Sequence, residues 1–140
     1  MSTKISGLTE LNNKFAKAIQ EMPHVSAQAL QEVAMDLLAK SANQAPLDKG
    51  DLRKSATIHI NGDLTGQANE EGNVIQTKKP RGKSKNTGIV AYNEEYALRQ
   101  HEEMEWRHTT GNAKFLERPF HENINNYIKF IKRKSEEVGE

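Results

Sequence analysis

Two prolines divide the N-terminal part of the chain into two predicted helices. Apolar residues recur at helical spacings over residues 8–22, and Pro23 ends or kinks the helix that this pattern predicts. The pattern resumes at Val25 and predicts a second helix of about 18 residues, with Ser26 near its N-terminus. Pro46 prevents this second helix from continuing.

The middle of the chain predicts a small sheet and a long loop. Alternating apolar and β-branched residues over 52–60 predict the first strand. Residues 61–88 hold five of the nine glycines and few large apolar residues, which predicts a long mobile loop with a short strand near 73–78. A further strand is predicted over 87–92, before a short helix over 94–103.

The C-terminal part predicts a last helix that begins near Pro119, because proline is well placed in the first turn of a helix. Its apolar side includes Phe120, Ile124 and Ile131, and the segment 132–137 is expected to be a solvated tail. The element order predicts an α+β fold in which a small antiparallel sheet of three to four strands packs with a long N-terminal helix and a C-terminal helix, with a long loop between the first strands.

A chain of 140 residues is long enough for one hydrophobic core. We therefore expect a single domain over 1–140. Its parts are a helical region at 1–44, the sheet with loop 61–88 and a short helix at 45–112, and the C-terminal helix and tail at 113–140.

Composition removes several function classes. The chain has no cysteine, so disulfides, thiolate zinc sites and cysteine nucleophiles are excluded. No apolar run is long enough to cross a bilayer, and the first residues do not form an apolar leader, so we expect no membrane partner. The net charge of +1 implies no general affinity for polyanions, so any such affinity must come from a local cluster.

The sequence does not predict an enzyme. His101 and His108 are seven residues apart, whereas a zinc-protease helix needs two histidines four apart around a catalytic glutamate. We interpret this stretch as a polar helix end next to Trp106, and keep a metallohydrolase that uses both histidines and Glu105 only as an alternative that bound metal would support. No serine-nucleophile elbow or phosphate-binding loop occurs, so we expect no catalytic, cofactor-binding or metal-binding residues and no cofactor.

One local cluster of positive charge stands out. Five cations fall within eight residues, interrupted by Pro80 and Gly82, which favour an extended segment. These candidate contacts for a partner or for DNA are Lys78, Lys79, Arg81, Lys83 and Lys85. Each phosphate contact would add salt-dependent affinity, but no aromatic residue is interleaved to stack on bases.

Three short blocks occur along the chain in a fixed order. The first is Ala45-Pro46 followed by Asp48, Gly50, Leu52, Arg53 and Ser55; the second is Tyr96, Ala97, Gln100, His101 and Glu102; the third runs from Ala113 to Pro119 and includes Phe115 and Leu116. In this order and spacing the blocks resemble the minor capsid, neck and tail-completion proteins of tailed bacteriophages. The resemblance covers about residues 30–131.

The resemblance implies a structural role in virion assembly. It implies a homo-oligomeric ring of six or twelve copies, located in the virion and, during assembly, in the host cytoplasm. The implied partners are head connector or stopper proteins on one side and tail-tube or tail-terminator proteins on the other, and the ring could touch packaged DNA. The alternative is a small nucleic-acid-binding protein that uses residues 78–85.

Overall fold

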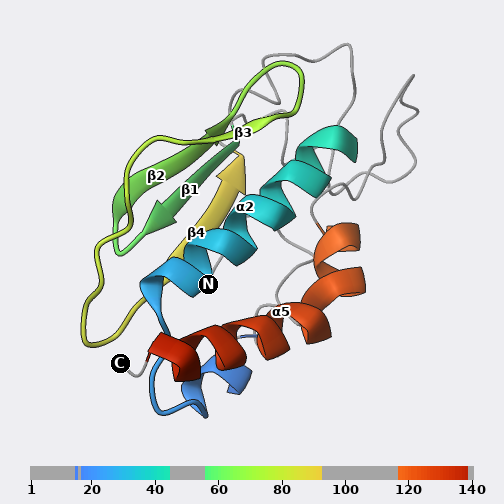
Figure 1. Cartoon of the computed structure of the whole chain (residues 1–140). Helices are drawn as coiled ribbons and strands as arrows, with labels where there is room; N and C mark the ends of the chain where they lie inside the picture. The colour runs from blue at the N-terminus through green and yellow to red at the C-terminus, as the bar shows by residue number, and fades with distance from the viewer. Residues whose placement is uncertain (1–14, 16, 45–55, 93–116, 139–140) are drawn as a thin grey trace.

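The computed structural model describes residues 15, 17–44, 56–92 and 117–138. Its elements are α2 (Ala27–Gln44), β1 (Ala56–Ile60), β2 (Asp63–Ala68), β3 (Val74–Gln76), β4 (Gly88–Tyr92) and α5 (Glu117–Val138). The strands form one antiparallel sheet in the order β3-β2-β1-β4. Helix α2 lies between one face of this sheet and α5 (Figure 1). The predicted α+β fold with a small antiparallel sheet is confirmed.

Helix α2 is the central element of the fold. Its 18 residues match the predicted length, and the Ser26 side chain caps its first turn by accepting a hydrogen bond from the Ala29 amide at 3.3 Å. Leu30, Leu37 and Leu38 are almost completely buried, because α2 contacts the sheet on one side and α5 on the other. None of the described helices is long and apolar enough to cross a membrane.

The prediction for α5 is confirmed for its apolar side and, over most of 132–137, for its solvated tail, where Ser135 is the buried exception. Phe120, Ile124 and Ile131 are buried, and Pro119 lies in the first turn. The helix continues through the segment that we expected to be a solvated tail. Ser135 lies one helical turn after Ile131 on the same side, so it is 95% buried and its hydroxyl accepts a hydrogen bond from the Ser26 amide at 2.9 Å.

The N-terminal segment packs against α5. Residues 15 and 17–20 are helical, and the helix ends before Pro23, as predicted. The Phe15 ring is fully buried and meets the Phe120 ring edge-on, with centroids 5.5 Å apart. Edge-to-face contacts of this kind are favoured by the quadrupoles of the two rings.

The predicted loop over 61–88 is wrong in its first half, which contains β2. Strands β1 and β2 are joined by a tight turn at Asn61-Gly62, where both residues have positive φ, 52° and 86°. These angles suit a type I′ hairpin turn, and Asn-Gly is the residue pair that adopts it most readily. The long loop therefore does not lie between the first two strands.

Strand β2 has no large apolar residue at its buried positions, and at Gly66 the space is filled from the neighbouring strand. Gly66 lies opposite Ile58, and a Cβ atom at that position would be only 2.9 Å from the Ile58 Cδ1 atom. A small residue is required there, so β2 does not show a strand-like apolar pattern. Strands β3 and β4 agree with the predictions over 73–78 and 87–92.

Candidate functional site

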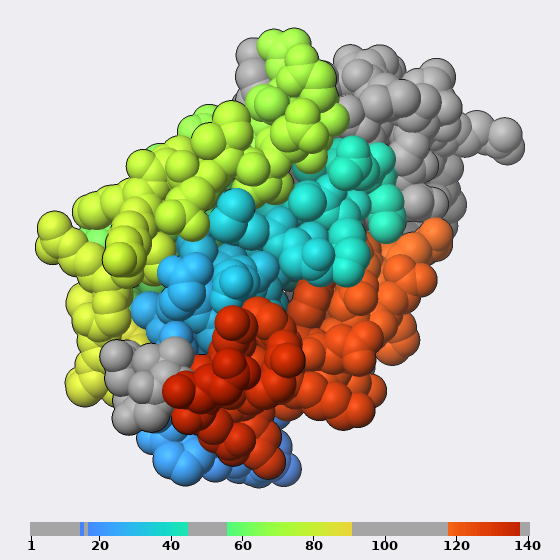
Figure 2. Space-filling model, viewed as in Figure 1, coloured from blue at the N-terminus to red at the C-terminus, as the bar shows by residue number. Residues whose placement is uncertain are grey.

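The basic segment, residues 78–85, connects β3 to β4 along one side of the molecule (Figure 2). All five of its cationic side chains are exposed. Lys78 pairs with the Asp63 carboxylate at 3.5 Å. The other four make no ion pair with any residue that the structure describes.

Asn61 holds the basic segment against the β1–β2 hairpin. Its Nδ2 atom donates to the Arg81 carbonyl at 2.7 Å, in the middle of the segment. Its Oδ1 atom accepts a hydrogen bond from the Thr87 amide at 2.9 Å, and its own backbone amide donates to the Thr87 carbonyl at the same distance. The residue that makes the tight turn is thus also an anchor for the chain that follows β3.

Asn86 is the second anchor and is 91% buried. Its Oδ1 atom accepts from the Lys83 amide at 2.7 Å and from Asn61 Nδ2 at 2.8 Å. Its Nδ2 atom donates to the Val25 carbonyl at 2.7 Å, just before α2 begins. We call Asn61 and Asn86 the amide bridge, because together they tie the basic segment to the hairpin and to the start of α2.

A hollow of about 590 Å³ lies between the basic segment and the first turn of α2. It is lined by His24, Ser26, Ala27, Gln28, Lys79, Pro80, Gly82, Lys83, Ser84 and Asn86. Two lysines and the positive end of the helix dipole give this surface a positive potential. The surface therefore suits negatively charged groups such as phosphates.

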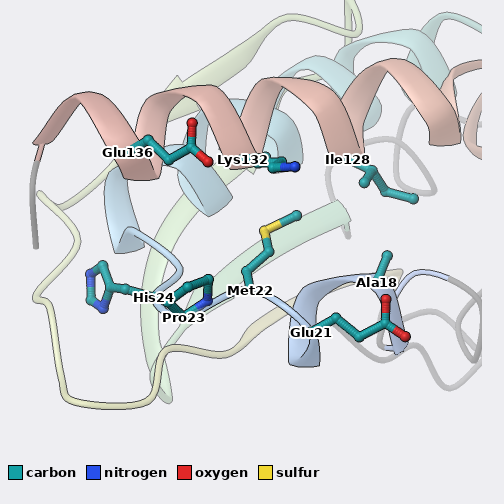
Figure 3. A pocket seen from close by; sticks show the side chains of 8 residues that line it. All are labelled: Ala18, Glu21, Met22, Pro23, His24, Ile128, Lys132 and Glu136. Carbon is teal, nitrogen blue, oxygen red and sulfur yellow. The ribbon is translucent and has the colours of Figure 1, made fainter.

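A second hollow, a groove of about 360 Å³, separates residues 18–24 from α5 (Figure 3). Met22 points toward α5 in this groove, and Ile128 lines it from the helix. Its charged lining alternates in sign, with Glu21 and Glu136 on either side of Lys132. This arrangement presents no concentrated charge of either sign, so the groove is a weaker candidate for an anion than the hollow beside the basic segment.

The interface between α2 and α5 holds a hydrogen-bonded carboxylate. Asp36 Oδ2 accepts from the Tyr127 hydroxyl and from Lys40 Nζ, each at 2.6 Å. Burial raises the pKa of Asp36, but the two hydrogen bonds and the nearby Lys40 charge outweigh it and lower the pKa below its ordinary value.

The same contacts keep the Tyr127 hydroxyl protonated. Burial and the adjacent Asp36 carboxylate raise its pKa far above the ordinary value, so the phenol acts as a hydrogen-bond donor and not as a base. We interpret the Tyr127–Asp36 hydrogen bond as a structural link between α5 and α2. No three His, Asp or Glu side chains gather within the described ranges in a way that could hold a metal ion.

Of the residues proposed from sequence, the structure describes the five cations of the basic segment, which are exposed, and Pro119, which is buried in α5. The remaining motif positions lie outside the described residues: Pro46, Gly50, Leu52, Arg53, Ser55, Tyr96, Ala97, Gln100, His101, Glu102, Phe115 and Leu116. The metal alternative with His101, Glu105 and His108 lies outside them as well.

Sequence reasoning missed both residues of the amide bridge. The Asn61-Gly62 pair, placed directly after an alternating apolar strand, is a strong hairpin signal that could have identified the turn. Nothing in the sequence around Asn86 indicates that its side chain joins three separate segments.

The chain was compared with known proteins at three levels, and no protein-family model, curated protein or solved structure matches it.

Proposed function

We propose that this chain is a structural protein of the neck of a tailed phage or prophage, and that its basic segment contacts the phosphate backbone of DNA. The three sequence blocks support the neck assignment through their resemblance to minor capsid and tail-completion proteins. The observation that carries the DNA contact is the basic segment, in which four exposed cations have no ion-pair partner among the described residues.

The chemistry of the segment favours the DNA backbone over the bases. Residues 77–87 include no aromatic side chain on which a base could stack. Lysine and arginine side chains neutralise phosphates whatever the sequence, and each neutralised phosphate releases counterions. Such a contact suits a protein that binds the DNA backbone without recognising the base sequence.

Ring assembly would multiply this contact. Copies in a closed ring are related by rotation, so the basic segment of every copy lies at the same radius and height. A ring of six or twelve copies between head connector or stopper proteins and tail-tube or tail-terminator proteins would then carry a collar of positive charge. DNA that passes through the neck would meet this collar if the segments face the channel.

A salt titration tests the DNA contact. Binding of the purified chain to duplex DNA should weaken with salt, and the double variant Lys79→Gln/Lys83→Gln should lower the log–log slope by roughly 1.8, at about 0.9 per phosphate. The matched control is Lys129→Gln/Lys132→Gln, which removes two exposed cations from α5 and should leave the slope unchanged. Equal slopes for the two double variants would contradict the contact.

A particle assay tests the neck assignment. Neutralising all five cations in the encoding phage should lower the yield of tailed, infectious particles while the purified variant remains folded. Unchanged yield would contradict a role of the basic segment in assembly, and absence of the chain from purified particles would contradict the neck assignment. The second candidate, a small nucleic-acid-binding protein that uses the same segment, predicts DNA binding by a chain that never enters particles.

A further inference from the structure

We infer that the amide bridge, Asn61 and Asn86, fixes the basic segment in its DNA-binding conformation before DNA arrives. The two asparagines are thus positioning residues for the contact, although neither carries charge. This inference rests on the proposed DNA contact. It also replaces the expectation of a mobile loop in this region, because the segment is tied down at defined atoms.

The bridge acts in the middle of the segment, where no strand pairing is available. At the start, the Thr77 amide donates to the Thr65 carbonyl at 3.0 Å, which continues the pairing of β3 with β2. Between that point and β4, two hydrogen bonds among the described residues hold the backbone of the segment, and both involve the bridge. Asn61 Nδ2 donates to the Arg81 carbonyl, and the Lys83 amide donates to Asn86 Oδ1.

The bridge also decides where the segment lies. Asn86 binds the Val25 carbonyl at 2.7 Å, and Asn61 belongs to the hairpin turn. The cations at 79, 81 and 83 are therefore placed between the turn and the start of α2. Without the bridge, DNA binding would have to order these residues, and that entropic cost would reduce the affinity.

Two kinds of substitution separate positioning from charge. The salt slope counts the phosphates that are neutralised, so removing a cation changes the slope. Removing a positioning residue leaves all cations in place, so it lowers the affinity at every salt concentration without changing the slope. A loss of affinity with a constant slope is therefore the signature of positioning.

Two neutral variants break the bridge in different ways. Asn86→Ala removes the contacts to Lys83 and Val25. Asn61→Gly removes the side-chain contacts to Arg81, Asn86 and Thr87. It keeps the hairpin, because glycine adopts the positive φ of 52° without strain. The matched control is Asn43→Ala at the other end of α2, where the side-chain amide donates to the Ala39 carbonyl in its own helix and to no other residue that the structure describes.

The experiment combines the salt titration with NMR relaxation of the backbone amides of residue 79 and residues 81–85, since Pro80 has no amide hydrogen. Each bridge variant should bind a 20-base-pair duplex about tenfold more weakly than the parent, because DNA binding would then have to order the basic segment. The salt slope should equal that of the parent. Order parameters over 79–85 should fall from values typical of rigid backbone, ~0.85, to below ~0.6. Asn43→Ala should match the parent in both measurements.

The outcomes separate this inference from the proposed function. A parent chain that does not bind the duplex overturns the DNA contact. Order parameters that stay high in both variants overturn the inference, whether or not the parent binds. A bridge variant that binds with a lower slope also overturns it, because the asparagines would then be needed for the phosphate contacts themselves. If Asn86→Ala does not fold, Asn61→Gly decides the result alone.

Discussion

The core around α2 and the contact at the start of α2 are held by different chemistry. The core that α2 shares with the sheet and α5 is apolar, with Leu37 and Leu38 buried in it and the Phe15 and Phe120 rings in edge-to-face contact. Beside the basic segment the contact is polar and consists of amide side chains that bind backbone carbonyls and amides. The apolar core supplies stability, whereas the polar contact places charge.

This difference teaches that a small fold can separate the contacts that stabilise it from those that hold its candidate binding surface. Apolar burial yields roughly 25 cal/mol per Å² and needs no precise direction. A few directed hydrogen bonds add less energy but fix the position of a segment that has no core of its own. Substitutions in the two regions should therefore have effects of different kind and size.

The largest effect is expected in the apolar core. Leu38→Ala leaves a cavity at a fully buried position between α2 and its neighbours and should lower the free energy of unfolding by about 2–5 kcal/mol. Urea denaturation measures this loss. Lys129→Ala on the exposed side of α5 is the control and should change stability by less than about 0.5 kcal/mol. A Leu38→Ala loss as small as that of the control would contradict the assigned core.

The next effect is expected between β1 and β2. Gly66→Ala places a Cβ atom 2.9 Å from Ile58 Cδ1 and should cost about 1–3 kcal/mol through overpacking. Ile58→Val removes the Cδ1 atom that clashes, so the double variant should be more stable than the sum of the two single losses predicts. Thermal unfolding of the four proteins gives this coupling energy. Strictly additive losses would show that the two residues do not contact each other.

A smaller, pH-dependent effect is expected at the interface of α2 and α5. Tyr127→Phe removes the hydroxyl that donates to Asp36 and should cost about 1 kcal/mol at pH 7. The folded-state pKa of Asp36 lies below its ordinary value of 3.8, so the stabilisation is present above that pH and is lost as the pH falls through the lower folded value.

The difference in stability between the parent and Tyr127→Phe should therefore shrink in strong acid. Unfolding measured at pH 7 and again well below pH 3.8 checks this change. If Tyr127→Phe lowers the stability by the same amount over this pH range, the contribution of the hydroxyl to stability does not depend on the charge of Asp36.

The smallest effect on stability is expected in the basic segment. Lys79→Gln/Lys83→Gln removes two exposed charges that have no partner among the described residues, so unfolding should change by less than about 0.5 kcal/mol. The same variant should lower the salt slope of DNA binding. Its urea unfolding curve, compared with that of the parent, checks whether stability and binding are separate. A loss similar to that of Leu38→Ala would show that they are not.

The sequence predicted the helices better than the first hairpin. The spacing of apolar residues in α2 and α5 is long and regular, so their existence and their buried sides were predicted correctly. The expectation of a loop was wrong over the first half of 61–88, because β2 has small and polar residues where a strand normally shows large ones. Gly66 is small because Ile58 fills the space opposite it, and that relation is not visible in the sequence.

The candidate site was only half visible in the sequence. The five cations are adjacent in the chain and were found directly. Asn61 and Asn86 are 25 residues apart, and their side chains meet at 2.8 Å only because β1 and β4 pair in the sheet.

The sequence by itself determined where the helices form, the α+β class and the cluster of positive charge, because these depend on local spacing and composition. The tertiary structure alone decided that the charge lies beside the start of α2 and that two asparagines hold it there. Hydrogen bonds between distant side chains depend on how the strands pair, and strand pairing is set by packing across the whole domain.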